Sequence, residues 1–295
     1  MATGQDFEKL FKDDAFVSKY KIGEKITGEF AKVLIEQSGI ANSTQRPLVI
    51  FDNACGTGII SSTLHDTLSV SARETWKLTC GDISEGMLEY TKQRIEHEHW
   101  HNAETKIVDA QNTGLPSTHY THVFAAFVFT TVPNYQAALD DLTYHSTSES
   151  FRILQPGGTI AISTWEKPGW IPIVKSAVET MPGNLPFPTT EEFLKTNTGQ
   201  WNSGSWVESQ LRKGGFENVQ ITAVSRSVRF DIHEFVSMAM AILPMLLQKF
   251  WTQEQRDQSE ANVQPTLLRY LEEKYGPHGQ VPAEFVAVIA TGHKP

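Results

Sequence analysis

The stretch Leu48-Val-Ile-Phe-Asp-Asn-Ala-Cys-Gly-Thr-Gly58 joins a short apolar run to a turn that contains two glycines. A continuous apolar run of this length is typical of a strand that is buried on both faces of a parallel sheet. Gly56 and Gly58 allow a tight turn, and they let the backbone lie against a ligand that a Cβ atom would push away. The apolar positions between Ile59 and Leu68 predict a helix directly after the turn. The stretch therefore predicts a strand, a ligand-binding turn and a helix in succession.

Segments with the pattern of strands alternate with helical segments along the rest of the chain. Helices are predicted over Phe7–Tyr20 and Ile26–Leu34, and another begins after Ser84, a residue type that caps helices. A further helix ends near Leu154, and one more covers Trp206–Lys213. This alternation predicts βαβ units and therefore an α/β fold with a mostly parallel sheet. The remaining strands are expected at 76–82, 105–109, 121–129, 159–165, 216–225 and 285–290.

Two long segments interrupt the strands of the C-terminal half. Residues 168–188 contain five prolines, which favours a loop or lid over a strand. Residues 232–275 have a helical periodicity that is interrupted at Pro244, and we expect them to form a cap over the carboxyl edge of the sheet. The predicted organisation is one domain, with N-terminal helices at 1–46, a core at 47–230 and 278–295, and a helical cap insert at 231–277.

Composition and charge limit the class of ligand. The 34 acidic and 25 basic side chains give a net charge of −9, without a lysine- and arginine-rich cluster, so nucleic acid is not an expected partner. No apolar run approaches the roughly 18 residues of a membrane span, so a membrane is not expected either. The two cysteines, Cys55 and Cys80, cannot form a disulfide framework, which favours the cytoplasm. A small molecule is the expected ligand, and the oligomeric state is not predicted.

Carboxylates follow the predicted strands at the edge of the sheet where the turn lies. Asp82 ends the second strand, where it can accept hydrogen bonds from a ribose diol. The turn almost fits the dinucleotide fingerprint, with Ser61 at the third glycine position, so an NAD-dependent dehydrogenase is one alternative. Asp52, however, would repel a pyrophosphate, and it suits a ligand that carries an ammonium and a sulfonium group. Asp109 and Ala110 end the third strand and offer a carboxylate to the amino group of an adenine.

Four motifs, in this order, carry a family resemblance: Asp52-Asn-Ala-Cys-Gly-Thr-Gly58, Gly81-Asp-Ile-Ser84, Asp109-Ala110 and Leu154-Gln-Pro-Gly-Gly158. Over residues 48–165 the chain resembles the class I S-adenosylmethionine-dependent methyltransferases. The resemblance implies S-adenosylmethionine as the cofactor and a Rossmann-like fold, with a seven-stranded mostly parallel sheet and helices on both faces. It also implies that the methionine end lies at the turn, the ribose at the second strand, and the adenine at the third. The implied cofactor-binding residues are Asp52, Ala54, Cys55, Gly56, Thr57, Gly58, Asp82, Ile83, Asp109, Ala110 and Phe127.

The likeness extends to the fungal natural-product methyltransferases, through the stretch Phe16-Val-Ser-Lys-Tyr20 and the arrangement of lid and cap. Within this group the chain resembles the thiomethyltransferases that act on dithiols of the dioxopiperazine type. The resemblance implies S-methylation, the transfer of a methyl group to a thiol, on a hydrophobic fungal secondary metabolite. An O-methyltransferase of a phenolic or polyketide metabolite is an alternative within the family. A non-catalytic regulator that binds a protein through its cap is an alternative outside enzymes.

Few residues are expected to act on the acceptor. No histidine occupies a convincing position for a general base, which favours an acceptor that ionises easily, such as a thiol with a pKa of about 8.5. Tyr20 is the candidate for a hydrogen bond near the methionine moiety or the acceptor. No metal is expected, because His97, His99 and His101 point in different directions around a helix end. Four large apolar side chains are the candidate substrate contacts: Phe129, Trp165, Trp170 and Met238.

Overall fold

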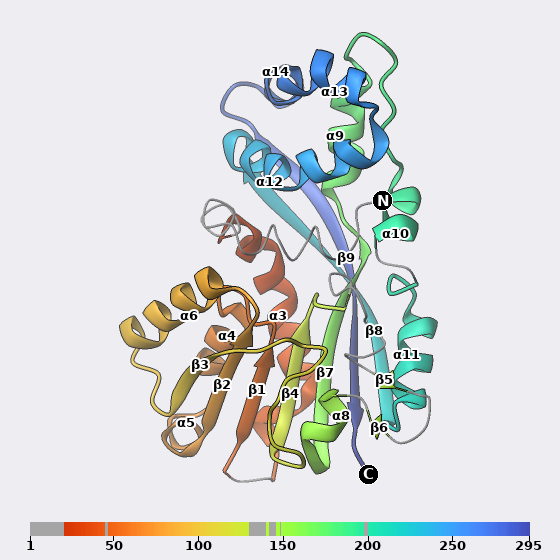
Figure 1. The fold of residues 1–295 in the computed structure, drawn as a ribbon. Helices are drawn as coiled ribbons and strands as arrows, with labels where there is room; N and C mark the ends of the chain where they lie inside the picture. Colours follow the sequence, from red (N-terminus) through yellow and green to blue (C-terminus); the bar gives the residue numbers. More distant parts are fainter. Residues whose placement is uncertain (1–20, 45–46, 130–139, 142–145, 148, 198–199) are drawn as a thin grey trace.

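The computed structural model describes residues 21–44, 47–129, 140–141, 146–147, 149–197 and 200–295 (Figure 1). The helix predicted over residues 7–20 and the candidate Tyr20 lie outside these ranges. In Figure 1 a sheet covered by helices forms the lower part of the molecule, and a group of helices lies above it. This arrangement separates a core from a cap.

A mostly parallel sheet forms the centre of the described residues. It has seven strands in the order β3-β2-β1-β4-β7-β9-β8. The neighbours β3, β2, β1, β4 and β7 are all parallel, whereas β9 is antiparallel to both β7 and β8. The Rossmann-like α/β prediction is therefore confirmed. The strands are β1 Val49–Asn53, β2 Lys77–Asp82, β3 Ala103–Ile107, β4 Tyr120–Ala126, β7 Leu154–Lys167, β8 Glu217–Asp231 and β9 Gln280–His293, and a separate pair consists of β5 Asp140–Asp141 and β6 Ser146–Thr147.

The two faces of the sheet bury two different hydrophobic clusters. Successive side chains of a strand point to opposite faces, and on β1 Ile50 joins one cluster while Phe51 joins the other. The cluster that contains Ile50 is covered by α3, α4 and α6, and the cluster that contains Phe51 is covered by α8 and α11. These helices are α3 Glu24–Ser38, α4 Ile59–Thr67, α6 Glu85–His97, α8 Glu149–Ile153 and α11 Gly204–Lys213, and short elements are η1 Lys21–Gly23, η2 Ile40–Asn42 and α5 Val70–Thr75.

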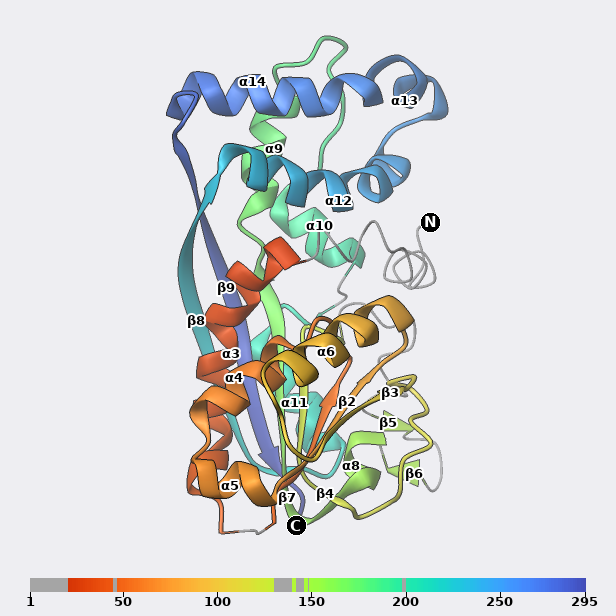
Figure 2. The same cartoon turned by 90° about the vertical axis from the view of Figure 1, so that its left-hand side faces the viewer.

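The cap lies beyond the carboxyl ends of the parallel strands, at the end of a two-stranded extension (Figures 1 and 2). Pairing between β7 and β9 ends at Lys167 with Val286, whereas pairing between β8 and β9 continues to Asp231 with Gln280. None of the helices in the described ranges combines the length and the hydropathy that a membrane span requires. The cap helices are α12 Ile232–Phe250, α13 Gln253–Ser259, η3 Glu260–Asn262 and α14 Val263–Tyr275, and α9 Trp170–Val178 packs against α14, with α10 Thr190–Asn197 following it in the chain.

The prediction of a loop or lid over residues 168–188 was wrong for Trp170–Val178, which form α9, whereas residues 179–188 contain no helix or strand. Pro172 is the third residue of this helix, in the first turn, where a backbone N–H has no intrahelical acceptor and its loss costs little. Ile171, Val174 and Val178 are buried on one face of α9. The burial of this apolar face outweighs the high proline content of the surrounding segment.

The prediction that Pro244 interrupts the cap helix was also wrong. Helix α12 runs through Pro244 and ends only at Phe250. The proline is exposed, while its neighbours Leu243, Leu246 and Leu247 are fully buried. The carbonyl group that loses its hydrogen bond on the proline side can therefore bond to water, and the buried leucines maintain the helix.

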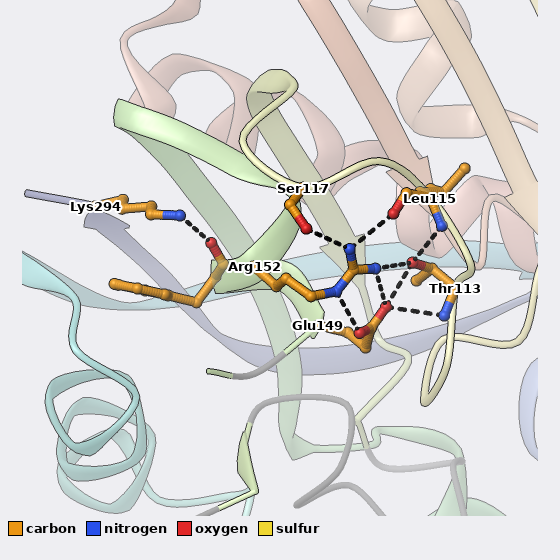
Figure 3. A network of polar contacts seen from close by, with 7 residues as sticks. Thr113, Leu115, Ser117, Glu149, Arg152 and Lys294 are labelled. Carbon is orange, nitrogen blue, oxygen red and sulfur yellow. Dashed lines mark hydrogen bonds and ion pairs between the residues drawn. The ribbon is translucent and has the colours of Figure 1, made fainter. Parts of the chain in front are cut away.

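A polar network fixes α8 against the loop that leads from β3 to β4 (Figure 3). The Arg152 Nε atom lies 2.7 Å from Glu149 Oε1, and Arg152 Nη1 donates to the Leu115 carbonyl oxygen at 2.8 Å. Glu149 Oε2 accepts hydrogen bonds from the backbone and the hydroxyl group of Thr113. Burial acts to raise the pKa of Glu149, but the bonds from Arg152 and Thr113 lower it overall. The network therefore anchors the loop that carries Asp109.

Gly169 lies between β7 and α9 and packs closely against strand β9, and a substitution there tests this packing. A Cβ atom at Gly169 would collide with the backbone of Glu284, so Gly169→Ala should lower the free energy of unfolding by about 1–3 kcal/mol. Gly23→Ala is the matched control, because Gly23 also precedes a helix with helical φ and ψ but has open space around it. Urea unfolding should show a change below about 0.5 kcal/mol for the control. Equal stability of the two variants would contradict the steric argument.

Candidate functional site

The glycine turn lies at the carboxyl end of β1 and has an unusual backbone. Ala54, Gly56 and Gly58 all have positive φ values, of 54°, 55° and 81°. For Ala54 this conformation is strained, and such strain persists only where surrounding contacts fix it. The N–H of Cys55 donates to the Gly81 carbonyl oxygen at 2.9 Å, which ties the turn to the end of β2. The turn is thus held by the neighbouring strand.

The carboxylate of Asp82 binds three backbone groups at the same edge. Its Oδ2 atom accepts from Gly56 N–H at 2.9 Å, its Oδ1 atom accepts from Ser84 N–H at 2.9 Å, and the Ile83 N–H also bonds to it. The side chain is buried, and burial raises the pKa of Asp82 while these three hydrogen bonds lower it. A carboxylate has about four acceptor positions, so room for a further donor remains.

Side chains of α6 hold the turn from the other side by donating hydrogen bonds to the carbonyl groups of the turn. The Thr91 hydroxyl donates to the Gly56 carbonyl oxygen at 2.9 Å, and Arg94 Nη1 donates to the Thr57 carbonyl oxygen at 3.0 Å. A Cβ atom at Gly58 would lie 3.1 Å from the Thr91 side chain, so the close packing of helix and turn favours glycine there. Thr91 and Arg94 were not predicted as site residues, although their i, i+3 spacing places them on one face of a predicted helix.

Asp52 is almost completely buried beneath the turn. Its Oδ2 atom accepts hydrogen bonds from the Ser61 backbone at 3.2 Å and from the Ser61 hydroxyl at 2.7 Å. Burial raises the pKa of Asp52 to about 7, against the effect of the Ser61 bonds. Ser61 occupies the third glycine position of the dinucleotide pattern, and the structure gives it a different role, as the partner of a buried carboxylate.

Several buried acceptor oxygens at this edge have no hydrogen-bond partner among the described residues. They belong to the side chains of Asp52, Asn53, Thr57 and Glu24. Buried polar atoms in folded proteins are nearly always paired, so a group of unpaired acceptors favours a bound ligand with polar hydrogens. Asn53 was not predicted as a site residue, although its position directly after Asp52 at the end of the strand was a signal for it.

Asp109 and Ala110 lie in the loop after β3, which the structure brings beside β2. The third strand ends at Ile107, two residues earlier than predicted, because Asp109 Oδ1 accepts from the Gln111 N–H at 2.8 Å and turns the chain. The Val108 N–H donates to the Asp82 carbonyl oxygen at 2.9 Å. The predicted adenine residues and the predicted ribose residue therefore lie on adjacent segments.

An aromatic group follows β4 at the same edge. Phe127 has a positive φ of 59°, its N–H donates to the Ser163 carbonyl oxygen at 2.8 Å, and its ring stacks on Trp165 with centroids 4.0 Å apart. Phe30 contacts both rings edge-on. Trp165 also contacts Phe285, so aromatic contacts continue from the edge of the core to the β8–β9 extension that carries the cap.

The four candidate substrate contacts do not form one group. Trp165, Trp170 and Met238 belong to the same hydrophobic cluster as Phe127. Phe129 is buried in the cluster on the opposite face of the sheet, where its ring stacks on Trp201 at 5.1 Å. The structure thus separates Phe129 from the other three.

Among the residues that the structure describes, the remaining titratable groups form neither an activated nucleophile nor a metal centre. Burial raises the pKa of the Cys55 thiol well above its ordinary value, which keeps it protonated and unreactive. Within the described ranges, no three His, Cys, Asp or Glu side chains are grouped closely enough to hold a metal ion. His122 is buried within β4 beside Thr121, and His233 is exposed on the first turn of α12. His145 and Tyr20 lie outside the described residues.

Comparisons with known proteins agree with this geometry. Residues 50–158 match the family model described as a methyltransferase domain. The chain is 50% identical over 288 residues to methyltransferase tpcH of Aspergillus fumigatus, covering 98% of this chain and 99% of the relative. It is 45% identical over 291 residues to an acetylaranotin bis-thiomethyltransferase of Aspergillus terreus, covering 99% of this chain and 98% of the relative.

A solved structure supports the fold. The phosphoethanolamine N-methyltransferase 2 of Haemonchus contortus superposes with a TM-score of 0.54 at 13% identity, over 97% of this chain and 60% of that one. At this identity the likeness concerns the fold alone. The full-length similarity to fungal methyltransferases and the glycine turn at the carboxyl edge lead to one conclusion: the chain belongs to the methyltransferase family.

Proposed function

We propose that this methyltransferase uses S-adenosylmethionine to methylate a thiol of a hydrophobic small molecule, a fungal secondary metabolite. The observation that carries the proposal is the placement, at one sheet edge, of unpaired buried acceptors and an aromatic pair. The acceptors include Asp52 Oδ1 and Asn53 Oδ1, and the pair is Phe127 with Trp165. The thiol acceptor is further supported by the 45% identical relative, whose name describes a bis-thiomethyltransferase.

The residues of the turn suit the proposed cofactor. When bound, S-adenosylmethionine supplies a methyl group activated by a positively charged sulfur. Asp52 Oδ1 and Asn53 Oδ1 are acceptors suited to its ammonium group, and the free acceptor position of Asp82 suits a ribose hydroxyl. Ala54, Cys55, Gly56, Thr57 and Gly58 give the backbone of the turn, Ile83 follows the ribose position, and Asp109 and Ala110 remain the proposed adenine contacts.

On the acceptor side, the chain would act mainly by orientation and exclusion of water. Correct orientation alone can lower a barrier by about 7–11 kcal/mol. The residues that directly follow β1, β2 and β4 are Ala54, Ile83 and Phe127, and none of these side chains can act as a base. A thiol with a pKa of about 8.5 is partly ionised at neutral pH and needs no strong base, whereas a phenol with a pKa of about 10 is much less so.

We also propose which residues contact the acceptor, and in which compartment the enzyme acts. Trp165, Trp170 and Met238 are the proposed acceptor contacts, and Phe129 is left out because it packs on the other face of the sheet. We propose a metal-independent, cytoplasmic enzyme that acts as a single domain and requires neither nucleic acid nor a membrane. Neither Cys55 nor Cys80 forms a disulfide, and both thiols are buried, as suits a reducing compartment.

The acceptor can be tested with three compounds that share one apolar skeleton and carry a dithiol, a monothiol or a phenol. With S-adenosylmethionine present, mass spectrometry should detect methylated products of the thiols at least about tenfold faster than of the phenol, because more of each thiol is ionised. The thiol rate should rise with pH up to about pH 8.5. Preferred methylation of the phenol would instead support an O-methyltransferase.

Replacement of Asp82 tests the cofactor site. Asp82→Ala should weaken binding of S-adenosylhomocysteine by about 1–3 kcal/mol, because it removes an acceptor for the ribose and the partner of Gly56 N–H. Isothermal titration calorimetry measures this affinity, and NAD serves as the comparison ligand that should produce no binding heat. Glu89→Gln, an exposed position on α6, is the control and should bind as the unmodified protein does. Unchanged affinity in Asp82→Ala would remove Asp82 from the site.

The buried charge of Asp52 should make stability depend on pH. Its pKa of about 7 in the folded chain, against 3.8 as the ordinary value, means that folding favours the protonated acid. The contribution of Asp52 to the free energy of unfolding is therefore greatest below about pH 4, falls as the pH rises to about 7, and stays low above that.

Asp52→Asn removes this charge and should stabilise the ligand-free protein by roughly 2–4 kcal/mol at pH 8, since one pKa unit corresponds to about 1.4 kcal/mol. The difference should vanish near pH 4, which urea unfolding at several pH values can show. The same variant should bind S-adenosylhomocysteine more weakly at pH 8, because the anionic partner of the ammonium is lost. A variant that is less stable than the parent at pH 8 would contradict the assignment of an uncompensated buried charge.

A further inference from the structure

Arg94 on α6 connects three segments that are far apart in sequence: the start of α3, the glycine turn and the end of α6. Its Nη1 atom donates to the Thr57 carbonyl oxygen at 3.0 Å, and its Nη2 atom binds Glu24 Oε2 at 3.0 Å. Its Nε atom lies 3.4 Å from Oε1 of Glu98, the C-cap residue of α6. The Arg94 and Glu24 side chains are only 14% and 13% exposed, so solvent screens their attraction weakly.

The carboxylates around Arg94 orient its guanidinium group toward the turn. Guanidinium is planar and its donors have a fixed arrangement, so the two carboxylates of Glu24 and Glu98 determine the orientation of the Arg94 group. The donor that remains on Nη1 then meets the Thr57 carbonyl oxygen. The peptide between Thr57 and Gly58 is held from both sides, because its carbonyl oxygen accepts from Arg94 and its N–H donates to the Cys55 carbonyl oxygen at 2.9 Å. Of these two bonds, only the one from Arg94 comes from a charged side chain.

We propose that Arg94 and Glu24 form a positioning pair that holds the cofactor turn in its binding conformation. Glu24, in the first turn of α3, fixes Arg94, and Arg94 fixes the carbonyl of Thr57. Without Arg94 this carbonyl would lose its charged donor, and only the bond from Gly58 N–H to Cys55 would hold the peptide, so the conformation that presents Gly56 and Gly58 to the ligand would be less populated. The inference rests on the proposed binding of S-adenosylmethionine at the turn.

Calorimetric titration with S-adenosylhomocysteine tests the pair in the full-length chain. Arg94→Met should weaken binding about tenfold or more, and Glu24→Gln should weaken it severalfold. Because Glu24 acts through Arg94, the double variant should bind no more weakly than Arg94→Met alone. Arg94→Lys, which keeps one positively charged donor, should restore part of the affinity. Circular dichroism at the titration temperature establishes that each variant is folded.

Lys25→Met is the matched control. Lys25 neighbours Glu24 on α3 but pairs with Glu234 of the cap at 2.6 Å, so its loss should leave the affinity unchanged. The proposal is overturned if folded Arg94→Met binds as the parent does, or if the Glu24 and Arg94 effects multiply in the double variant. Should Arg94→Met not fold, the comparison of Arg94→Lys with Glu24→Gln decides: parental affinity in both overturns the proposal. Absence of binding by the parent would overturn the proposed function and not the pair specifically.

Discussion

The hydrogen bond from Gly56 N–H to the carboxylate of Asp82 is the contact on which the site depends. It joins the end of β2 to the turn after β1, and the same carboxylate also binds the start of α6 through Ser84 N–H. The positive φ of Ala54 strains the turn by on the order of 1–3 kcal/mol, whereas Gly56 and Gly58 adopt positive φ without this cost. Such a conformation persists because its amide and carbonyl groups are fixed from both sides, by β2 and by α6. The turn is therefore prepared for its ligand before the ligand binds.

The same arrangement buries two carboxyl groups, those of Asp52 and Asp82, near the turn. Asp52 and Asp82 are both almost inaccessible to solvent, burial raises the pKa of each, and the charge of Asp82 further raises the pKa of Asp52. No cationic side chain is hydrogen-bonded to either carboxylate in the described part of the chain; their partners are Ser61 and backbone N–H groups. A cationic ligand would supply the missing compensation, whereas a pyrophosphate would add to the repulsion. The electrostatics therefore favour a sulfonium nucleoside over a dinucleotide, and they explain why stability and binding place opposite demands on Asp52.

The sequence predicted those parts of the fold that local patterns determine. The apolar run, the glycine turn and the Ser84 cap depend on residues close in the chain, and the structure has all three. The length of β8 and β9 was underestimated, because the extension is stabilised by pairing between strands that are far apart in sequence. The roles of Thr91 and Arg94 depend on how α6 is rotated against the turn, which periodicity does not specify to within one residue. The strand predicted over 121–129 would place Phe127 and Phe129 on one face, but β4 ends at Ala126 and Phe127 has a positive φ, so Phe129 packs on the face opposite to Trp165.

The link between the core and the cap is aromatic, and this bears on the choice of acceptor. Phe127 keeps a positive φ that is unfavourable for a bulky residue, while the Ser163 hydrogen bond and the Trp165 stack hold it there. From Trp165 the ring contacts pass to Phe285, then to Phe230, and reach Phe235 on α12. Rings in this arrangement provide apolar surface and no proton acceptor of useful basicity. An acceptor that contacts these rings gains no base from them, which favours a thiol, because a thiol ionises more readily than a phenol or an alcohol.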